Sequence, residues 1–155
     1  SATVTFTATD ECGNSSKTTA TFTIEDTTPP LIDPQAQDKT VECDGAGNND
    51  ELWAWIESQG GANATDICGG VTWTHDFTAL SDECGATGSA TVTFTATDEC
   101  GNTSTTTATF IIKDTTPPLI DPQAEDLTVE CDGSGNVTEL WNWIENQGCA
   151  DASDL

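Results

Sequence analysis

Residues 89–118 read SATVTFTATDECGNTSTTTATFIIKDTTPP, and this stretch decides the fold of the chain. Apolar residues alternate with threonines on both sides of a central DECGN segment: Val92, Phe94 and Ala96 before it, and Ala108, Phe110 and Ile112 after it. Such alternation is typical of strands that bury one face. The DECGN segment tolerates a tight or left-handed turn, and the prolines of the DTTPP that follows cannot donate to a sheet ladder. The stretch therefore predicts a terminal β-hairpin and a linker.

Nearly the same text opens the chain, where residues 1–30 read SATVTFTATDECGNSSKTTATFTIEDTTPP. Aligning residue 1 with residue 89, an offset of 88, makes 52 of the 67 overlapping residues identical. A fixed offset of this kind indicates a tandem array of modules. We expect residues 1–26 to be the C-terminal hairpin of one module, residues 27–114 to be a complete module, and residues 115–155 to be the N-terminal part of a third. The chain is then a window on a longer array.

The chain is strongly acidic, with 27 Asp and Glu against three Lys and Arg and a formal net charge of -24. This charge argues against nucleic acid or an anionic membrane as a partner and favours bound divalent cations. No apolar stretch is long enough to span a membrane, so we expect no membrane insertion. Seven cysteines without a CxxC pair indicate disulfides, and hence an extracellular, secreted or cell-surface location.

Within the complete module we expect an edge strand at residues 39–43 and a short helix in NNDELWAWIESQGGA. Asp50, or Thr138 in the second copy, is a suitable N-cap, and Gly60 can end the helix. So short a helix is unstable alone in water, which predicts that its tryptophans pack against the sheet. The alternative is a sugar-stacking platform formed by the paired tryptophans, Trp53 with Trp55 or Trp141 with Trp143.

The run from Val71 to Phe77 alternates again and predicts a half-buried strand, with His75 partly buried and hydrogen-bonded rather than catalytic. Together these segments predict a mostly β fold, a small β-sandwich with one short helix in each module. Val71 to Phe77 and residues 90–97 are expected to be antiparallel neighbours, which brings Cys68 to Cys100 and leaves Cys43 for Cys84. The partners of Cys12, Cys131 and Cys149 stay open.

The motifs VTFTATDECGN and DTTPP resemble those of hyalin-type (HYR) repeats and of bacterial immunoglobulin-like repeats. With VECDG at residues 41–45 and DICGGVTW at residues 66–73, the chain is similar to a four-cysteine HYR-like module over nearly its whole length. Such modules occur in tandem in large surface proteins of Bacteroidota, including gliding-motility adhesins exported by the type IX system. The resemblance implies an immunoglobulin-like sandwich and a structural or adhesive role. Cys149, which stands where the first copy has Gly61, departs from the pattern.

The resemblance also implies calcium near the linkers, because related adhesin repeats bind it there, and Ca²⁺ prefers six to eight carboxylate and carbonyl oxygens. The expected ligands are Asp26 of the linker and the turn residues Asp98, Glu99 and Asn102, with Asp114 and Asp10 at the equivalent positions. The alternative is that Asp98 and Asn102 only form the turn. Thr27 and Thr115 lie in DTT sequences that resemble Bacteroidota O-glycosylation sites, and Asn102 lies in an N-x-S/T sequon.

The leading functional hypothesis is a non-enzymatic spacer and adhesion scaffold, whose partners are neighbouring modules of the chain and other copies in a fibre. One alternative is a module that binds surface glycans or cells through exposed tryptophans and loop carboxylates. Another is ice binding through the Thr-x-Thr rows. An enzyme is not expected, because the sequence contains no phosphate loop, nucleophile elbow or His cluster.

Overall fold

The hairpin expected from residues 89–118 is the centre of the middle module. In the computed structural model, which describes residues 1–154, β7 (Gly88–Asp98) and β8 (Thr103–Lys113) pair antiparallel, with Val92 opposite Ala108. The alternating pattern sorts the side chains as expected: Val92, Phe94 and Phe110 have no exposed surface, while the threonines of the opposite face are exposed or half-buried; Thr106 lies on the buried face. Burial of one face of this hairpin supplies half of the module's core.

The hairpin lies inside a four-stranded sheet in the order β4-β8-β7-β6. β4 (Lys39–Glu42) pairs parallel with β8, and β6 (Val71–His75) pairs antiparallel with β7. The prediction that β4 is an edge strand is confirmed. β6 ends two residues before Phe77, and His75 is exposed, so the expected partial burial of this histidine is wrong.

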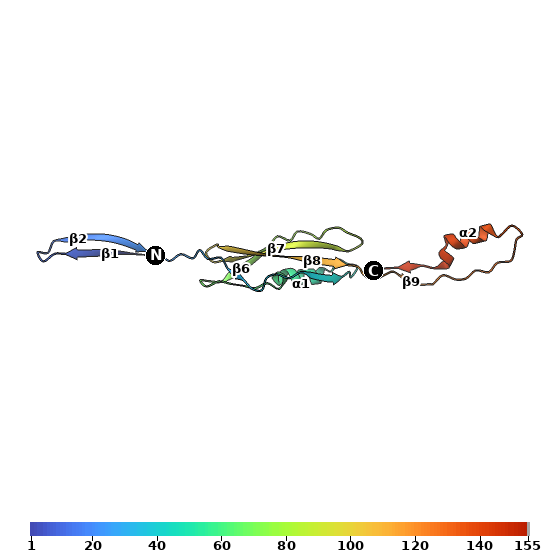
Figure 1. The fold of residues 1–155 in the computed structure, drawn as a ribbon, viewed down its shortest axis with the longest axis horizontal. Coiled ribbons are helices and arrows are strands. Elements are labelled where there is room, and N and C mark those ends of the chain that lie inside the picture. Colours follow the sequence, from blue (N-terminus) through green and yellow to red (C-terminus); the bar gives the residue numbers. More distant parts are fainter. Residues whose placement is uncertain (155) are drawn as a thin grey trace.

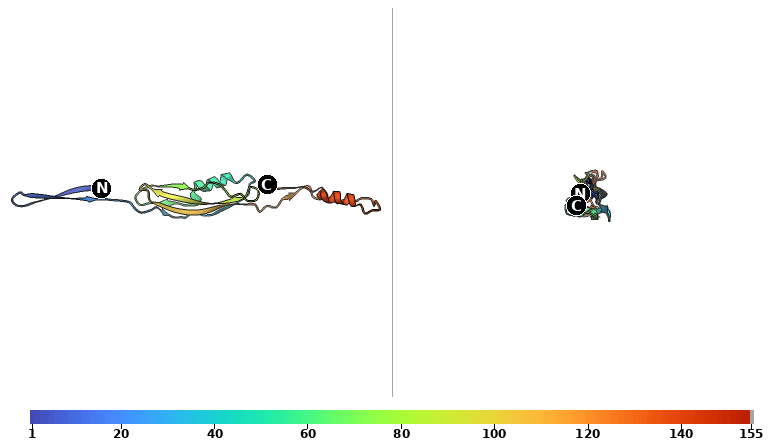
Figure 2. Two further views of the ribbon diagram at one scale, coloured as in Figure 1. Left: turned by 90° about the horizontal axis from the view of Figure 1, so that it is seen from above. Right: turned by 90° about the vertical axis from the view of Figure 1, so that its left-hand side faces the viewer.

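A thinner second layer covers the buried face of the sheet. It contains a two-stranded ribbon of β3 (Leu31–Ile32) and β5 (Ala64–Thr65), the helix α1 (Asn49–Glu57) and the 3₁₀ turn η1 (Gln59–Gly61). Figures 1 and 2 show α1 running along the sheet. The mostly β fold with short helices is confirmed, whereas the second layer is a ribbon and a helix rather than a second broad sheet.

Trp55 connects the two layers. Its ring lies edge-on to Phe94 and tilted against Phe110, with centroids 5.5 Å apart in both pairs, and its Nε1–H donates to the carbonyl of Gln37 at 3.0 Å. Leu52, about one turn before Trp55, and Ile56, the residue after it, are also buried. Trp53 is 47% exposed and makes an edge-on contact with Phe77. The prediction of core packing is therefore confirmed for Trp55, whereas the Trp53 side chain is only partly covered.

The helix begins and ends differently from the sequence-based expectation. It ends at Glu57 with Ser58 as its C-cap, and Gly60 lies in the 3₁₀ turn that follows. Its N-cap is Asn48, in the left-handed region at φ 48°, and not Asp50, which lies in the first turn. Asn48 is buried because its side chain bridges the preceding loop, donating to the carbonyl of Glu42 at 2.9 Å and accepting from the amide of Asp44. Asp50 still suits its place, because a carboxylate in the first turn interacts favourably with the helix dipole. In the second copy Asn136 takes the same role, so Thr138 is not the N-cap either.

The flanking segments adopt most of the local structures of their copies in the middle module, although residues 127–130, the copy of β4, form no strand. β1 (Ala2–Thr9) and β2 (Ser15–Phe22) form a hairpin. The third segment contains β9 (Leu119–Ile120), α2 (Val137–Glu145), η2 (Gln147–Cys149) and β10 (Ala152–Ser153). Figures 1 and 2 show these two segments at opposite ends of an elongated molecule. Most of the local structure therefore follows the repeated sequence.

Candidate functional site

The first linker, residues 26–30, is hydrogen-bonded to the final hairpin of the middle module. Asn102 donates through Nδ2 to the carbonyl of Asp26 at 3.2 Å, and Ser104 donates through Oγ to the carbonyl of Pro30 at 2.6 Å. The Asp26 carboxylate accepts from the amide of Thr28, which closes a tight turn. Prolines 29 and 30 have restricted φ angles. Two hydrogen bonds to the middle module therefore restrain the linker, in addition to the restricted φ angles of its prolines.

Asp98 organises the hairpin turn that receives this linker. Its Oδ1 accepts from the amides of Cys100 and Asn102, both at 2.8 Å, and its Oδ2 accepts from Nδ2 of Asn102 at 2.7 Å. Burial alone raises the pKa of Asp98, but the hydrogen bonds from Asn102, Cys100 and Gly101 outweigh it and lower the pKa. Asp10 and Asn14 repeat this arrangement in the first hairpin. Asp98 and Asp10 therefore act as acceptors within their turns.

Glu99 points to a different neighbour. Its Oε1 accepts from the amide of Gly70 at 3.3 Å, and a Cβ atom on Gly69 would lie 3.2 Å from Cδ of Glu99. The side chain lies over the two glycines that precede β6. Glu99 thereby connects the hairpin turn to this loop.

An acidic group that the sequence analysis missed lies where the linker meets this loop. One ligand atom each of Asp26, Asp66 and Cys68 lie within 4.8 Å of one another. Asp66 also accepts from the amide of Cys68 at 2.8 Å. The signal that points to Asp66 is its place two residues before Cys68, because the expected approach of Cys68 to Cys100 brings this loop to the hairpin turn.

The same acidic surroundings affect two cysteines. Burial and then the charges of Asp26, Asp66 and Asp98 raise the pKa of Cys68, and burial followed by Asp26 and Asp98 raises that of Cys100. A raised pKa keeps these groups as thiols near neutral pH, which is the opposite of what a nucleophilic cysteine needs.

The four cysteines of the middle module lie at the two ends of its sheet. Cys68 and Cys100 lie near enough that the charge on Cys68 also raises the pKa of Cys100. Cys43 donates its amide to the carbonyl of Lys113, and Cys84 precedes Gly88, which pairs with Ile112, so both are at the other end. All seven cysteines are free thiols in this structure, and the two disulfides stay predictions.

The predicted calcium ligands therefore contact different groups. Asp26 reaches the turn and meets Asp66, whereas Asp98 serves the turn, Glu99 bonds Gly70 and Asp114 accepts from Thr116 in its own linker. Calcium prefers six to eight oxygen ligands, and a thiol sulfur is a poor substitute. Asp26 and Asp66 offer two carboxylates, so the residues fit a calcium ion only in part, with most of its shell left to backbone oxygens or water.

The second linker, residues 114–118, is hydrogen-bonded to the module that precedes it. Glu42, at the end of β4, accepts from the amide of Thr115 at 2.7 Å and from its hydroxyl at 2.9 Å, and also from the hydroxyl of Thr116 at 3.1 Å. These bonds, the Thr115 amide first, lower the pKa of Glu42. The sequence analysis missed Glu42, because its position inside a strand gives no hint of a linker contact.

The glycosylation candidates lie among these same contacts. The hydroxyl of Thr115 donates to Glu42, and Nδ2 of Asn102 donates to both Asp98 and Asp26. A glycan on either atom would replace at least one of these bonds. Thr27, the copy of Thr115 in the first linker, is exposed.

A cavity of about 360 Å³ lies between α1 and β6 and is a second candidate site. Trp53 and Trp73 supply its aromatic surface, and Glu57, Gln59 and His75 supply polar groups. Aromatic walls with a few polar groups are typical of small-ligand sites. Trp55, the other half of the expected platform, is instead buried in the core.

No helix within residues 1–154 combines the length and apolar character needed to span a membrane. A scan of protein-family models finds none that matches the chain, and no curated protein matches it.

Proposed function

We propose that the chain is part of a secreted or cell-surface array of immunoglobulin-like modules that acts as a stiff spacer and adhesion scaffold. The observation that carries the proposal is the hydrogen bonding of the two linkers, each to the middle module at its own end. A flexible tether has no need of such contacts. An array in which every linker is fixed in the same way extends its length without a change in module geometry.

The repeat lets both sets of contacts be combined on one linker. The first and second linkers share the sequence DTTPP at the offset of 88. In a continuous array, each linker would be held by a Glu42 equivalent before it and by Asn102 and Ser104 equivalents after it. The disulfides of Cys68 with Cys100 and of Cys43 with Cys84 would then fasten both ends of each module.

Small-angle scattering from three joined copies of residues 27–114 tests the proposal. We expect a rod-like particle with a narrow range of angles between modules. Replacing Glu42 and Ser104 by Ala in every copy should broaden that range, because each substitution removes a linker contact. A matched change at Glu51, which is exposed on α1, should leave the profile unaltered. A broad range in the unsubstituted array would contradict the proposal.

A second candidate function is glycan binding at the cavity between α1 and β6. The half-exposed Trp53 favours it, since an exposed tryptophan can stack on a sugar ring. Glycan-array binding that is lost in Trp53→Ala, with an unchanged melting temperature, would support it. Binding that persists in this variant would count against this cavity.

A further inference from the structure

The cavity between α1 and β6 combines an aromatic surface with a single carboxylate. Part of its lining is apolar core, because Ile56 and Phe94 are buried. Trp53 and Trp73 add aromatic surface that is partly exposed. Among the described residues that line the cavity, Glu57 is the only one with a carboxylate. All of these residues belong to the complete middle module, so the cavity is the same wherever that module stands in an array.

The lysines of the middle module lie toward the other edge of its sheet. The chain has three lysines and no arginine, and two of the lysines, Lys39 and Lys113, are in this module. Lys39 begins β4 and Lys113 ends β8, whereas the cavity borders β6, the edge opposite β4. Neither lysine is therefore placed to neutralise Glu57. In a chain with a formal net charge of -24, cations from solution are attracted instead.

Glu57 also occupies an unfavourable place for a carboxylate. It is the last residue of α1, where the helix dipole concentrates partial negative charge and favours a cation. The last turn of α1 contains no basic residue. The second copy repeats the arrangement, because Glu145 is the last residue of α2 and that turn has no basic residue either. A positive group bound in the cavity would be stabilised by the carboxylate and by the helix end together.

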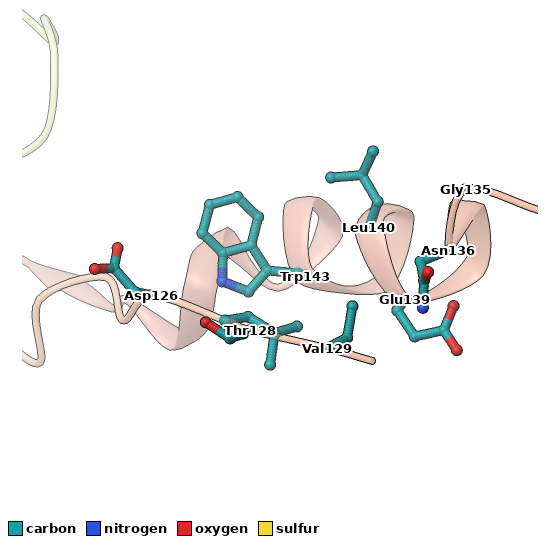
Figure 3. Close-up of a pocket in the computed structure, with 9 residues that line it drawn as sticks. Asp126, Thr128, Val129, Gly135, Asn136, Glu139, Leu140 and Trp143 are labelled. Carbon is teal, nitrogen blue, oxygen red and sulfur yellow. The ribbon is translucent and has the colours of Figure 1, made fainter. Parts of the chain in front are cut away.

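The two tryptophans of α1 have different roles, and α2 repeats the role of the buried one. Trp143, the copy of Trp55, donates its Nε1–H to the carbonyl of Glu125 at 2.9 Å, and Trp55 likewise donates to a carbonyl at 3.0 Å. Figure 3 shows Trp143 beside the chain segment that contains Asp126. Trp53 is instead 47% exposed and lines the cavity. Core packing therefore accounts for Trp55 but not for the exposed surface of Trp53.

The second copy of the helix retains the residues that line the cavity. Comparison of residues 49–61 with residues 137–149 gives five differences, at positions 49, 50, 54, 58 and 61. None of these positions lines the cavity. Trp53, Glu57 and Gln59 line it and are identical in the copy, although all three are at least partly exposed. Exposed positions without a packing role are free to change, so their retention indicates a shared use.

The chemistry of the lining selects an organic cation rather than a metal ion. The face of a tryptophan ring attracts an ammonium group, most strongly where water is partly excluded. Calcium prefers six to eight oxygen ligands, which one carboxylate between aromatic rings does not supply. A sugar that carries an amine offers both a ring for stacking and a charge for Glu57.

We propose that this cavity binds an amino sugar, with the sugar ring stacked on a tryptophan and the protonated amine against Glu57. The proposal rests on the second candidate function, glycan binding, and adds the class of glycan. A neutral sugar would use the tryptophan faces alone and would give Glu57 no part in binding. An array of such modules would attach to surfaces rich in amino sugars through one site in each module.

Calorimetry on the whole chain with three β-1,4-linked tetrasaccharides, of glucosamine, N-acetylglucosamine and glucose, tests the proposal. The three differ only in the group at C2, which is an ammonium, an acetamide or a hydroxyl. The titrations are made at physiological salt, where exposed charges are screened beyond about 8 Å, and at a pH at which the sugar amines are protonated. We expect the glucosamine tetramer to bind about tenfold more tightly than the other two.

The outcomes separate this proposal from those on which it builds. Equal affinity for the three tetramers would overturn the amino-sugar assignment and leave glycan binding in place. Binding of none of them would overturn both. Neither result bears on the stiff spacer, which the scattering experiment tests.

Two glutamate variants distinguish the site from general attraction to an acidic surface. Glu57→Gln removes the charge but keeps the size, so it should weaken binding of the glucosamine tetramer about tenfold and abolish the preference over glucose. Glu51→Gln is the matched control, because it removes the same charge from an exposed residue of α1 outside the cavity. Equal weakening by the two substitutions would overturn the proposal.

Trp53→Ala tests the aromatic part of the site. It should abolish binding of the glucosamine tetramer, because it removes the exposed ring on which the sugar stacks. The melting temperature of each variant is measured alongside, and Glu57→Gln remains a test of the site where Trp53→Ala destabilises the module. Undiminished binding by a folded Trp53→Ala chain would place the ligand elsewhere and overturn the proposal.

Discussion

Gly60 and Gly61 are adjacent glycines in η1, the turn that follows α1, and the structure predicts very different costs for giving each a side chain. Both have left-handed backbone, at φ 65° and 81°. A Cβ atom on Gly60 would lie 3.1 Å from Cβ of Ala36 and 3.4 Å from the rings of Phe94 and Trp55. A Cβ atom on Gly61 would meet nothing within 4 Å. The two positions therefore share a backbone cost but differ in packing.

The magnitudes follow from these two terms. Left-handed backbone costs a residue with a Cβ about 1–2 kcal/mol. Forcing an extra carbon into a packed core adds about 1–3 kcal/mol. Gly61→Ala should thus lower the free energy of unfolding by about 1–2 kcal/mol, and Gly60→Ala by about 2–5 kcal/mol. The second copy agrees with this order, because it retains Gly148 but has Cys149 at the position of Gly61, with φ 70°.

Urea denaturation followed by tryptophan fluorescence measures both values, since Trp55 contacts the site and is buried in the folded state. The unsubstituted chain and Gly61→Ala serve as the two references. Equal destabilisation by the two substitutions would refute the packing argument. A larger effect of Gly61→Ala would refute the assignment of which glycine faces the core.

Three further predictions concern the cysteines, the carboxylates and calcium. Peptide mapping without reductant should find Cys68 joined to Cys100 and Cys43 to Cys84, and loss of either bridge should cost about 4 kcal/mol in the chain-entropy model; pairing of Cys43 with Cys68 would contradict the assignment. The melting temperature should be constant near neutral pH and fall below about pH 4. Hydrogen bonds from backbone amides, that of Asn48 first, lower the pKa of Asp44 from 3.8, so the stability that this carboxylate adds is lost as the pH falls through the lowered value. Asp44→Asn should weaken this pH dependence. Calcium should raise the melting temperature, and Asp26→Asn with Asp66→Asn should abolish the increase; no effect of chelation at physiological salt, where exposed charges are screened beyond about 8 Å, would count against a site.

The hairpin was predictable because a strand that buries one face has apolar residues at alternate positions of its sequence. The positions of Val92, Phe94 and Phe110 gave the buried face without any tertiary information. The start of α1 was not predictable in the same way. Capping rules favour Asn and Asp alike, so they do not choose between Asn48 and Asp50. The chain uses Asn48 in a left-handed conformation fixed by bonds to the preceding loop, with no side-chain bond to the helix.

The junction was only half predictable for a similar reason. The sequence indicated that Asp26 approaches the Asp98 turn, and the bond from Asn102 to Asp26 connects them. Asp66 reaches the first linker because its loop returns to that end of the module. Glu42 reaches the second linker because it ends β4, the edge strand that runs parallel to β8. Those arrangements depend on the packing of elements far apart in the sequence, and no local pattern records them.

The acidic composition has a structural explanation that competes with the calcium hypothesis. Hydrogen bonds lower the pKa of five carboxyl groups. The side chains of Asn14 and Asn102 contribute most to this lowering at Asp10 and Asp98, and backbone amides contribute most at Glu42, Asp44 and Asp132. Each carboxylate accepts from amides of a turn, a loop or a linker, which have no partner in a helix or sheet. Acids placed in this way fix turns and linkers without a cation, and the repeat multiplies them in every module. The two explanations differ at Asp26 and Asp66, which approach each other and for which calcium would replace repulsion by shared coordination. The response to calcium therefore separates them: if the acids serve turns alone, calcium leaves the melting temperature of the unsubstituted chain unchanged, and the double Asn variant differs from it only by the relief of repulsion.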